Sequence, residues 1–577
     1  MSDTYAPPLR PVTLGAVSSS MLAGLADAPR WALYSVAATI LFTAFMIYRY
    51  PYRERVLHYR NLPGPPSSHF LFGDFPKVQS HPTGRVMQAW FDEYGPTVRA
   101  KLLLGDNLIV TSDTTAMAFI MQHADHFIKP PAQTRMITRL LGHGLLNVNF
   151  DTHRRQRRVL NPAFHPDAIR DMVPHMFTKA YELRDKLMEA CADPEYYDPE
   201  TAAPRPEDVV PGARKVNMNK YLINTTFDVI GLAGFDYEFG CLRTGNHIVT
   251  TFRNAMSELQ RLTLFGVLQQ MIPALDVIPS KRNKLADQAR IGTSGVGREC
   301  IARKRREMEA MHQDDLNKGT FVGKDLLSLM LKANMAKDLL PRDRLDDTEM
   351  AYQVSTFILA GSETTSNSLT WTLYRLAMNP DVQQRLREEL DTLASDEPSL
   401  EQLNTLPYLE NVIHESLRLD PPVPESMRMV TQDVMLPLHT PVKGRDGTMI
   451  DSVPMKKGDM IITGYMQVNH NKEIWGADAD RFNPDRFDRP GIPARKAPGT
   501  WGNITSFNGG NRNCIGYRFA LAEIKAILFV LLRHFQFEML PSSPTITAKN
   551  FIIMLPWVVG EENVGSQMPL MVRPIVE

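Results

Sequence analysis

The sequence predicts a mainly helical protein with a small β region, preceded by a single N-terminal transmembrane helix. Apolar residues recur three or four positions apart, as on the buried face of a helix, over 346–378 and again after Cys514. Residues 217–239 are continuously apolar, which is typical of a buried helix. One short segment, 97–111, interleaves apolar and polar residues as a strand does.

An uncharged apolar run at 31–48 predicts the transmembrane helix. At roughly 1.5 Å per residue the run is about 27 Å long, close to the thickness of a bilayer core. Arginines follow at 49, 53, 55 and 60 against the single acid Glu54, so the positive-inside rule places the rest of the chain in the cytosol. A cleaved signal peptide and a buried core helix are the alternatives. The long segment before the run disfavours the first, and the abrupt arginine cluster disfavours the second.

The residues around this run divide the chain into further segments. Residues 1–30, rich in Ser, Ala and Pro, are expected to be a lead-in segment. Residues 49–66 are expected to be a basic, proline-rich hinge, since the prolines clustered at 63–66 cannot continue a helix, although an ordinary proline-rich loop explains them equally well. Residues 67–577 then form the globular domain, in which the acidic, proline-rich residues 192–215 are expected to be a surface insertion.

Charge and cysteine usage exclude several classes of protein. Lysine plus arginine equal aspartate plus glutamate at 64 each, so the charge balance indicates no nucleic-acid partner. The four cysteines, at 191, 241, 300 and 514, are scattered and contain no C-x-x-C pair. This spacing argues against a disulfide framework and against a zinc site.

Residues 507–516 place one cysteine in a glycine-rich loop just before a helix. A helix N-terminus stabilises negative charge, so Cys514 is expected to stay a thiolate suited to ligate haem iron. Gly509 and Gly510 allow a tight turn beside a flat macrocycle, and Arg512 is placed to reach a haem propionate. The alternative is a small buried hydrophobe, which is what most lone cysteines are.

A second motif, Ala360-Gly361-Ser362-Glu363-Thr364-Thr365, lies inside the long helix predicted over 346–378. A threonine there donates a hydrogen bond to the carbonyl four residues earlier and loosens the helix. Gly361 lets a ligand approach the backbone. Glu363 and Thr364 are therefore candidates for acid–base work, which needs a positioned proton donor. Taken alone, the motif is explained as well by a helix kink with a solvated glutamate.

Two charged motifs complete the candidate site. Glu415 and Arg418 are three residues apart among apolar neighbours, so they share a helix face, and burial of such a pair requires further partners. The segment 153–164 begins with His153 and carries arginines at 154, 155, 157 and 158. Such a basic run is usually a solvated helix face.

Five positions of the cysteine loop agree with the haem-binding signature of the cytochrome P450 family, which this chain resembles: Phe507, Gly510, Arg512, Cys514 and Gly516. The resemblance implies the mainly helical P450 fold and a haem b whose iron takes the Cys514 thiolate as axial ligand. It also implies a monooxygenase, which inserts one oxygen atom of dioxygen into an apolar small-molecule substrate.

The same resemblance gives roles to the other motifs. Thr364 and Glu363 deliver protons from the oxygen-activating helix. Propionate binding is implied for four side chains: Arg512, Arg157, Arg428 and His153. His153 stands where the family usually has a tryptophan. A structural charged triad behind the haem is implied for Glu415, Arg418 and Arg486.

Electrons must come from another protein, because the chain has no Gly-x-Gly-x-x-Gly after a strand and no flavin-sized domain. The resemblance implies NADPH–cytochrome P450 reductase at the endoplasmic reticulum membrane. It would dock on a basic patch built from the arginines of 154–158, Arg518 and Lys525.

The alternatives are a haem-thiolate isomerase or dehydratase, which Thr364 argues against, and a non-enzymatic haem sensor, in which Glu363 and Thr364 would be idle. The substrate is expected to be a terpenoid, another secondary metabolite or a xenobiotic, in a eukaryote of fungal type.

Overall fold

The structure is a computed structural model that describes residues 29–102, 105–193, 195–198, 201–261, 263–310, 323–488, 497–550 and 552–575. The predicted lead-in segment lies outside the described residues except for its last two. The chain divides into two compact units, residues 1–60 and 61–577.

The described part of the first unit is one apolar helical stretch. Helix α2 (Arg30–Ile47) continues through a π-helical turn, η1 (Tyr48–Tyr52), into α3 (Arg53–Val56). Pro51 lies inside the π-helical turn and cannot donate a backbone hydrogen bond, which accounts for the local widening of the helix. No residue of α2 is buried, and the stretch is long and apolar enough to cross a bilayer. The apolar helix predicted over 31–48 is confirmed, and its insertion into a membrane stays a prediction.

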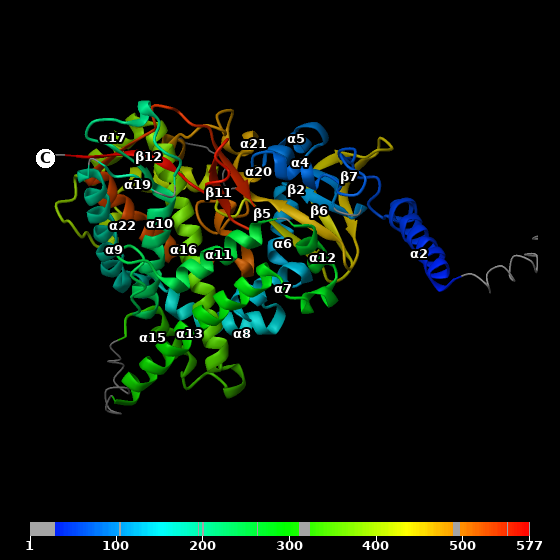
Figure 1. Ribbon diagram of the computed structural model, residues 1–577, viewed down its shortest axis with the longest axis horizontal. Helices are drawn as coiled ribbons and strands as arrows, with labels where there is room; N and C mark the ends of the chain where they lie inside the picture. The colour runs from blue at the N-terminus through cyan, green and yellow to red at the C-terminus, as the bar shows by residue number, and fades with distance from the viewer. Residues whose placement is uncertain are drawn as a thin grey trace, which may run out of the picture. The chain divides into compact units, whose positions relative to one another are not determined.

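The second unit is mainly helical; strands β2, β5, β6 and β7 lie near α4, α5 and α6, whereas β12 lies near α17 and α19 (Figure 1). Its α-helices are α4 (Phe75–Ser80), α5 (Arg85–Tyr94), α6 (Thr114–Gln122), α7 (Pro131–Leu141), α8 (Phe150–Leu160), α9 (Pro166–Ala192), α10 (Met218–Phe235), α11 (His247–Gln260), α12 (Leu264–Met271), α13 (Lys281–Ala310), α15 (Leu326–Asn334), α16 (Asp347–Met378), α17 (Pro380–Leu390), α18 (Leu400–Leu403), α19 (Pro407–Leu419), α20 (Tyr465–Asn469), α21 (Lys472–Trp475) and α22 (Tyr517–His534). Its strands are β1 (Thr97–Lys101), β2 (Asn107–Thr111), β3 (Phe127–Ile128), β4 (Arg214–Asn217), β5 (Glu425–Val430), β6 (Val434–Lys443), β7 (Met449–Met455), β8 (Met460–Gly464), β9 (Phe535–Glu538), β10 (Ile546–Asn550), β11 (Met554–Val558) and β12 (Pro569–Pro574).

The largest sheet has the strand order β1-β2-β8-β5-β3 and is antiparallel except for the β2–β8 pair. Strands β1 and β2 pair from Thr97 opposite Thr111 to Lys101 opposite Asn107, which confirms the β region predicted at 97–111. Smaller sheets pair β6 with β7, β10 with β11, and β12 with both β4 and β9.

The predicted surface insertion at 192–215 is partly wrong. Strand β4 begins at Arg214 and pairs with β12, so the end of this segment belongs to a sheet. Asp198 is buried, with 1% of its surface exposed, and its carboxylate accepts a hydrogen bond from the backbone N–H of Asn217 at 3.2 Å. Asp198 therefore has a structural role at the end of β4, in a segment whose proline-rich sequence is typical of a loop.

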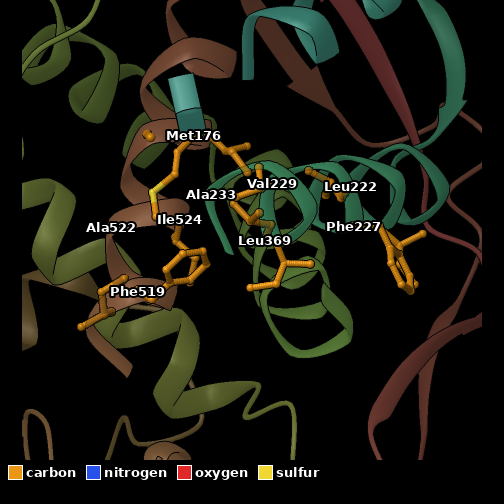
Figure 2. Close-up of a cluster of buried hydrophobic side chains, with 14 of the residues drawn as sticks. Met176, Leu222, Phe227, Val229, Ala233, Leu369, Phe519, Ala522 and Ile524 are labelled. Atoms are coloured by element: carbon orange, nitrogen blue, oxygen red, sulfur yellow. The ribbon is translucent and has the colours of Figure 1, made fainter. Parts of the chain in front are cut away.

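Helix α16 is the central element of the hydrophobic core. It begins with a capping box, in which the Asp346 side chain accepts from the Glu349 N–H and the Glu349 side chain accepts in return. Helices α10, α13, α19 and α22 pack against it. Figure 2 shows buried side chains of α10, α16 and α22 gathered in this core, among them Leu369 and Ile524. This packing fixes α16 against α22, the two helices that flank the candidate site.

Candidate active site

A cavity of about 330 Å³ lies between α16 and the loop that precedes α22. Cys514 of that loop and Thr364 of α16 both line it, as does Gly361. Much of the remaining lining is apolar and includes Leu145, Ile230, Phe357, Ala360 and Val423. The two motifs that the sequence singled out, 150 residues apart, therefore meet at one cavity.

The cysteine loop is held closed by hydrogen bonds to its backbone. The N–H of Cys514 donates to the carbonyl oxygen of Phe507 at 2.9 Å. Arg157 of α8 donates to the carbonyl oxygen of Asn513 at 2.8 Å and also to the Asn513 side chain. Arg157 is thus a clamp on the loop as well as a cavity-lining cation, a role that the sequence did not indicate.

Two glycines of the loop, Gly510 and Gly516, have different surroundings. Gly510 has a φ of +62°, and a Cβ there would lie 2.2 Å from the carbonyl oxygen of Met121, at the end of α6. That close approach requires the glycine, whereas the sequence argument had invoked room for a macrocycle. Gly516 lines the cavity, and a Cβ there would meet only the Phe164 ring, at an ordinary 3.5 Å. The protein therefore leaves open space in front of Gly516.

The protonation of Cys514 differs from the sequence argument. Its thiol opens on to the cavity three residues before α22 begins at Tyr517. Desolvation by the surrounding protein raises the pKa of the thiol, while the Gly516 backbone N–H and the Arg157 guanidinium oppose that rise. The helix N-terminus does not outweigh the desolvation.

The α16 side of the cavity carries hydroxyl groups. The Thr364 hydroxyl donates to the Ala360 carbonyl oxygen at 2.6 Å, the back-bonding that the sequence predicted, and α16 remains helical across the motif. The Thr365 hydroxyl oxygen is buried and has no hydrogen-bond partner among the described residues. Glu363 is buried but does not line the cavity. Burial raises the pKa of its carboxyl to about 7, and Arg253 of α11 opposes the rise.

All four predicted propionate ligands line the same cavity: Arg157, described above, and Arg428, Arg512 and His153. Arg512 donates to the Val148 carbonyl oxygen at 2.7 Å, and Arg428 donates to its neighbour Met427 at 2.9 Å. Burial, then repulsion from Arg428, lowers the pKa of Arg512 to about 10. Burial, then Arg512, lowers the pKa of His153 to about 3, so its imidazole is neutral and has one N–H to donate.

Arg157, Arg428 and Arg512 form a cluster of cations at the cavity, which we call the cation cluster. Lys129 belongs to it as well, and the sequence reasoning missed this residue. Its ammonium group lines the cavity and donates to the Leu146 carbonyl oxygen at 2.6 Å. Burial lowers the pKa of Lys129 well below its ordinary value, and repulsion from Arg428 and Arg512 lowers it further. Mutually repelling buried cations are costly unless an anion pairs with them. Lys129 belongs to no motif, and only the folding of the chain brings it to the arginines.

These features fit a haem b. The thiol of Cys514 could ligate its iron, the open space before Gly516 would accommodate a flat ring, and the cation cluster would suit two propionate carboxylates.

The predicted charged triad is confirmed. Arg418 donates to both carboxylate oxygens of Glu415, at 2.7 and 2.8 Å, and Arg486 donates to one of them at 3.2 Å. All three side chains are fully buried. Arg486 also contacts Asp478 at 2.7 Å, and Arg418 donates to the carbonyl oxygen of Asn469 at 2.6 Å. The additional partners satisfy the donors, as a buried ion pair requires.

Part of the predicted basic patch forms an open hollow of about 850 Å³ beside the cysteine loop. We call this feature the proximal hollow and define it by Arg154, Arg157, Arg158 and His165. Asn513 of the cysteine loop also lines it. Positive charge and the cysteine loop thus share one surface.

Three residues predicted for the patch do not line the proximal hollow. Arg518 is exposed, but its guanidinium lies over the Tyr517 ring, outside the hollow. Lys525 is buried on α22, where its ammonium contacts Glu410 at 2.5 Å and donates to the Asn404 side chain at 2.7 Å. Arg155 points away from the hollow and pairs with Glu349 at the start of α16. Lys525 was predicted at the surface because α22 was expected to bury only one face, whereas α22 is buried on almost every face.

The fold and the site define a haem-thiolate protein, and comparison with known proteins agrees. A model of the Cytochrome P450 family matches residues 63–557. Cytochrome P450 monooxygenase 205 of Postia placenta is 37% identical over 523 residues, which cover 89% of this chain and 93% of that protein. Cytochrome P450 monooxygenase claO of Ampulloclitocybe clavipes is 32% identical, with coverages of 89% and 93%. Ganoderic acid synthetase CYP5150L8 of Ganoderma lucidum is 32% identical, with coverages of 88% and 92%.

The chain therefore belongs to the cytochrome P450 family. It is a P450 monooxygenase, whose chemistry requires a redox partner, dioxygen and an organic substrate.

Proposed function

We propose that Cys514 ligates the iron of haem b and that the enzyme hydroxylates, or otherwise oxidises, a small apolar substrate of secondary metabolism. The observation that carries the proposal is the meeting of three groups at one cavity: the Cys514 thiol, the Thr364 hydroxyl and the cation cluster that includes Lys129. The cations would hold the propionates of the bound haem.

When bound, haem with a thiolate ligand supplies oxygen activation and favours O–O cleavage. The residues of this chain supply protons and orientation. The Thr364 hydroxyl turns from the Ala360 carbonyl to donate into the cavity. Glu363, one residue away with a pKa of about 7, holds the proton that restores the Thr364 hydroxyl. Apolar side chains such as Phe357 and Ile230 hold the substrate and exclude water.

The test of the iron ligand is the spectrum of the reduced carbon monoxide complex. Wild-type enzyme is expected to show the red-shifted Soret band of thiolate-ligated haem, and Cys514→Ser is expected to lose it. Cys191→Ser is the matched control, because that half-buried cysteine lies outside the cavity and its thiol contacts the Val572 carbonyl. Persistence of the band in Cys514→Ser would refute the assignment.

The substrate class rests on the lining of the cavity and on the relatives. Much of the cavity lining is apolar, including Phe357, Ile230 and Val423, and one relative is named a ganoderic acid synthetase. We therefore favour a terpenoid or another secondary metabolite over a xenobiotic. Substrate-dependent NADPH consumption with added reductase separates a monooxygenase from a haem-thiolate isomerase, dehydratase or sensor, since none of these consumes NADPH.

We further propose that NADPH–cytochrome P450 reductase docks on the proximal hollow, with α2 anchoring the enzyme in the endoplasmic reticulum membrane. Arg158 has 69% of its side chain exposed there, and Arg261, outside the hollow, has 68% exposed. Arg158→Glu should slow reductase-driven turnover several-fold at low salt and less at high salt, because rim charges mainly steer association. Arg261→Glu is the matched control. Equal effects of the two variants would contradict the docking site.

A further inference from the structure

The two faces of strand β5 line two different cavities. Successive residues of a strand point to opposite faces of the sheet. Ser426 and Arg428 line the haem cavity described above, whereas Glu425 and Met427 line a second cavity of about 240 Å³. The largest sheet therefore separates the two spaces at β5.

The walls of the second cavity are mostly apolar and belong to elements that the haem cavity does not use. Trp90 of α5, Val110 of β2 and Ile462 of β8 are buried in one hydrophobic cluster and line the cavity. Asn550 of β10 lines it as well. An engineered apolar cavity of about 150 Å³ holds benzene, so this volume suits a molecule somewhat larger than benzene.

Polar atoms without protein partners meet in this apolar space. The indole N–H of Trp90 and the side-chain oxygen of Asn550 are buried, and neither has a hydrogen-bond partner among the described residues. Trp90 itself is only 5% exposed. No described residue donates to the Glu425 carboxyl, whose pKa burial raises to about 7. Unpaired buried donors and acceptors are destabilising, and together these three groups present both donors and acceptors to the cavity.

The charges of the lining favour an uncharged ligand. Lys101 and Lys549 line the second cavity, and the buried acid Asp74 lines it as well, so the lining has no excess of one sign that would hold an ion. Lys549 has 43% of its side chain exposed, so the lining reaches the protein surface. Near neutral pH a protonated Glu425 donates a hydrogen bond, and its ionised form disfavours an anion.

We propose that the second cavity is a binding site for an uncharged, mainly apolar molecule that carries a hydroxyl or carbonyl group. The indole N–H of Trp90 donates to the ligand oxygen, and the Asn550 side-chain oxygen accepts from a ligand hydroxyl. Glu425 pairs with the same group. The site is distinct from the haem cavity because it lies across β5 from Ser426 and Arg428.

The probe is 1-octanol, titrated calorimetrically into the full-length holoenzyme. Clotrimazole, whose azole nitrogen ligates haem iron, first fills the haem cavity. We expect one saturable octanol site. Trp90→Phe and Glu425→Leu should each weaken it about tenfold, the effect of losing one hydrogen bond, whereas Glu425→Gln should stay within threefold. The cation n-octylammonium should bind at least tenfold more weakly than octanol to the wild type.

Ser426→Ala, on the opposite face of the same strand, is the matched control and should leave octanol affinity within threefold. The Soret spectrum of the carbon monoxide complex reports whether each variant is folded and loaded with haem. Absence of a saturable site in the wild type overturns the proposal, and would show that the cavity holds only water. A site that both Trp90→Phe and Glu425→Leu leave unchanged also overturns it.

Discussion

Glu363 should set the pH dependence of the coupling between NADPH oxidation and product formation. Its carboxyl is one residue from Thr364, and burial raises its pKa to about 7. The protonated fraction then falls from about 90% at pH 6 to about 10% at pH 8. Because only the protonated carboxyl resupplies Thr364, product formed per NADPH should fall up to about tenfold over this interval.

The same pKa shift affects stability, with a sign that follows from linkage. The folded-state pKa lies above the ordinary value of 4.5, so the folded protein binds this proton more tightly than the unfolded chain does. The contribution of Glu363 is therefore neutral below pH 4.5 and grows unfavourable as the pH rises to 7. Above pH 7 it amounts to about 3 kcal/mol against the folded state. Glu363→Gln, which cannot ionise, removes this slope.

The assay measures product and NADPH consumption with added reductase between pH 6 and 8, using a compound that shifts the Soret band of the wild type. Glu363→Gln should give low coupling that no longer varies with pH. Glu425→Gln is the matched control, since Glu425 is a second buried glutamate with a pKa of about 7, lying off the haem cavity. The reasoning fails if Glu363→Gln retains the wild-type pH profile, or if Glu425→Gln flattens it equally.

Three further changes test the supports of the site. Glu415→Gln removes the carboxylate shared by two buried arginines and should cost about 3–5 kcal/mol of stability. The control is Glu401→Gln at a surface ion pair, which should cost under about 1 kcal/mol. Equal shifts in thermal midpoint for the two variants would contradict the structural role of Glu415. Lys129→Met should speed haem transfer to apomyoglobin several-fold, because one propionate partner is lost. Lys281→Met, at an exposed lysine, is the control. Equal transfer rates for the two variants would show that Lys129 does not hold the haem. Burial raises the pKa of Glu523 well above its ordinary value, so wild-type stability should fall as the pH rises above the ordinary value of 4.5. Glu523→Gln should reduce that fall in thermal midpoint, and an unchanged fall would show that other groups cause it.

Features that are local in sequence could be predicted, because their causes are contiguous. The cysteine loop contains its ligand, its turn residues and the helix that follows within a few positions. Helix α16 was predictable from its long apolar pattern, and Thr364 makes the predicted bond to the carbonyl four residues earlier. The triad needed a distant partner for Glu415 and Arg418, and only the family resemblance supplied Arg486.

Features that depend on tertiary burial could not be predicted. Lys525 looks like a surface charge, yet α22 is covered on almost every face and places it beside Glu410. Lys129 joins Arg428 and Arg512 only when β3 and β5 pair. The direction of the Cys514 pKa shift likewise depends on how much protein surrounds the thiol. No sequence pattern reports the desolvation that decides these cases.

The buried triad has a consequence for how the enzyme folds. The contact between Glu415 and Arg486 spans 71 residues of chain. Burying the carboxylate or either guanidinium group without its partners carries a large desolvation penalty. The three charges must therefore dehydrate together, in a single cooperative step that joins α19 to the turn at Pro484–Asp488. An incompletely folded chain keeps all three hydrated. The triad thus couples the packing of α19 to the placement of the turn at Pro484–Asp488.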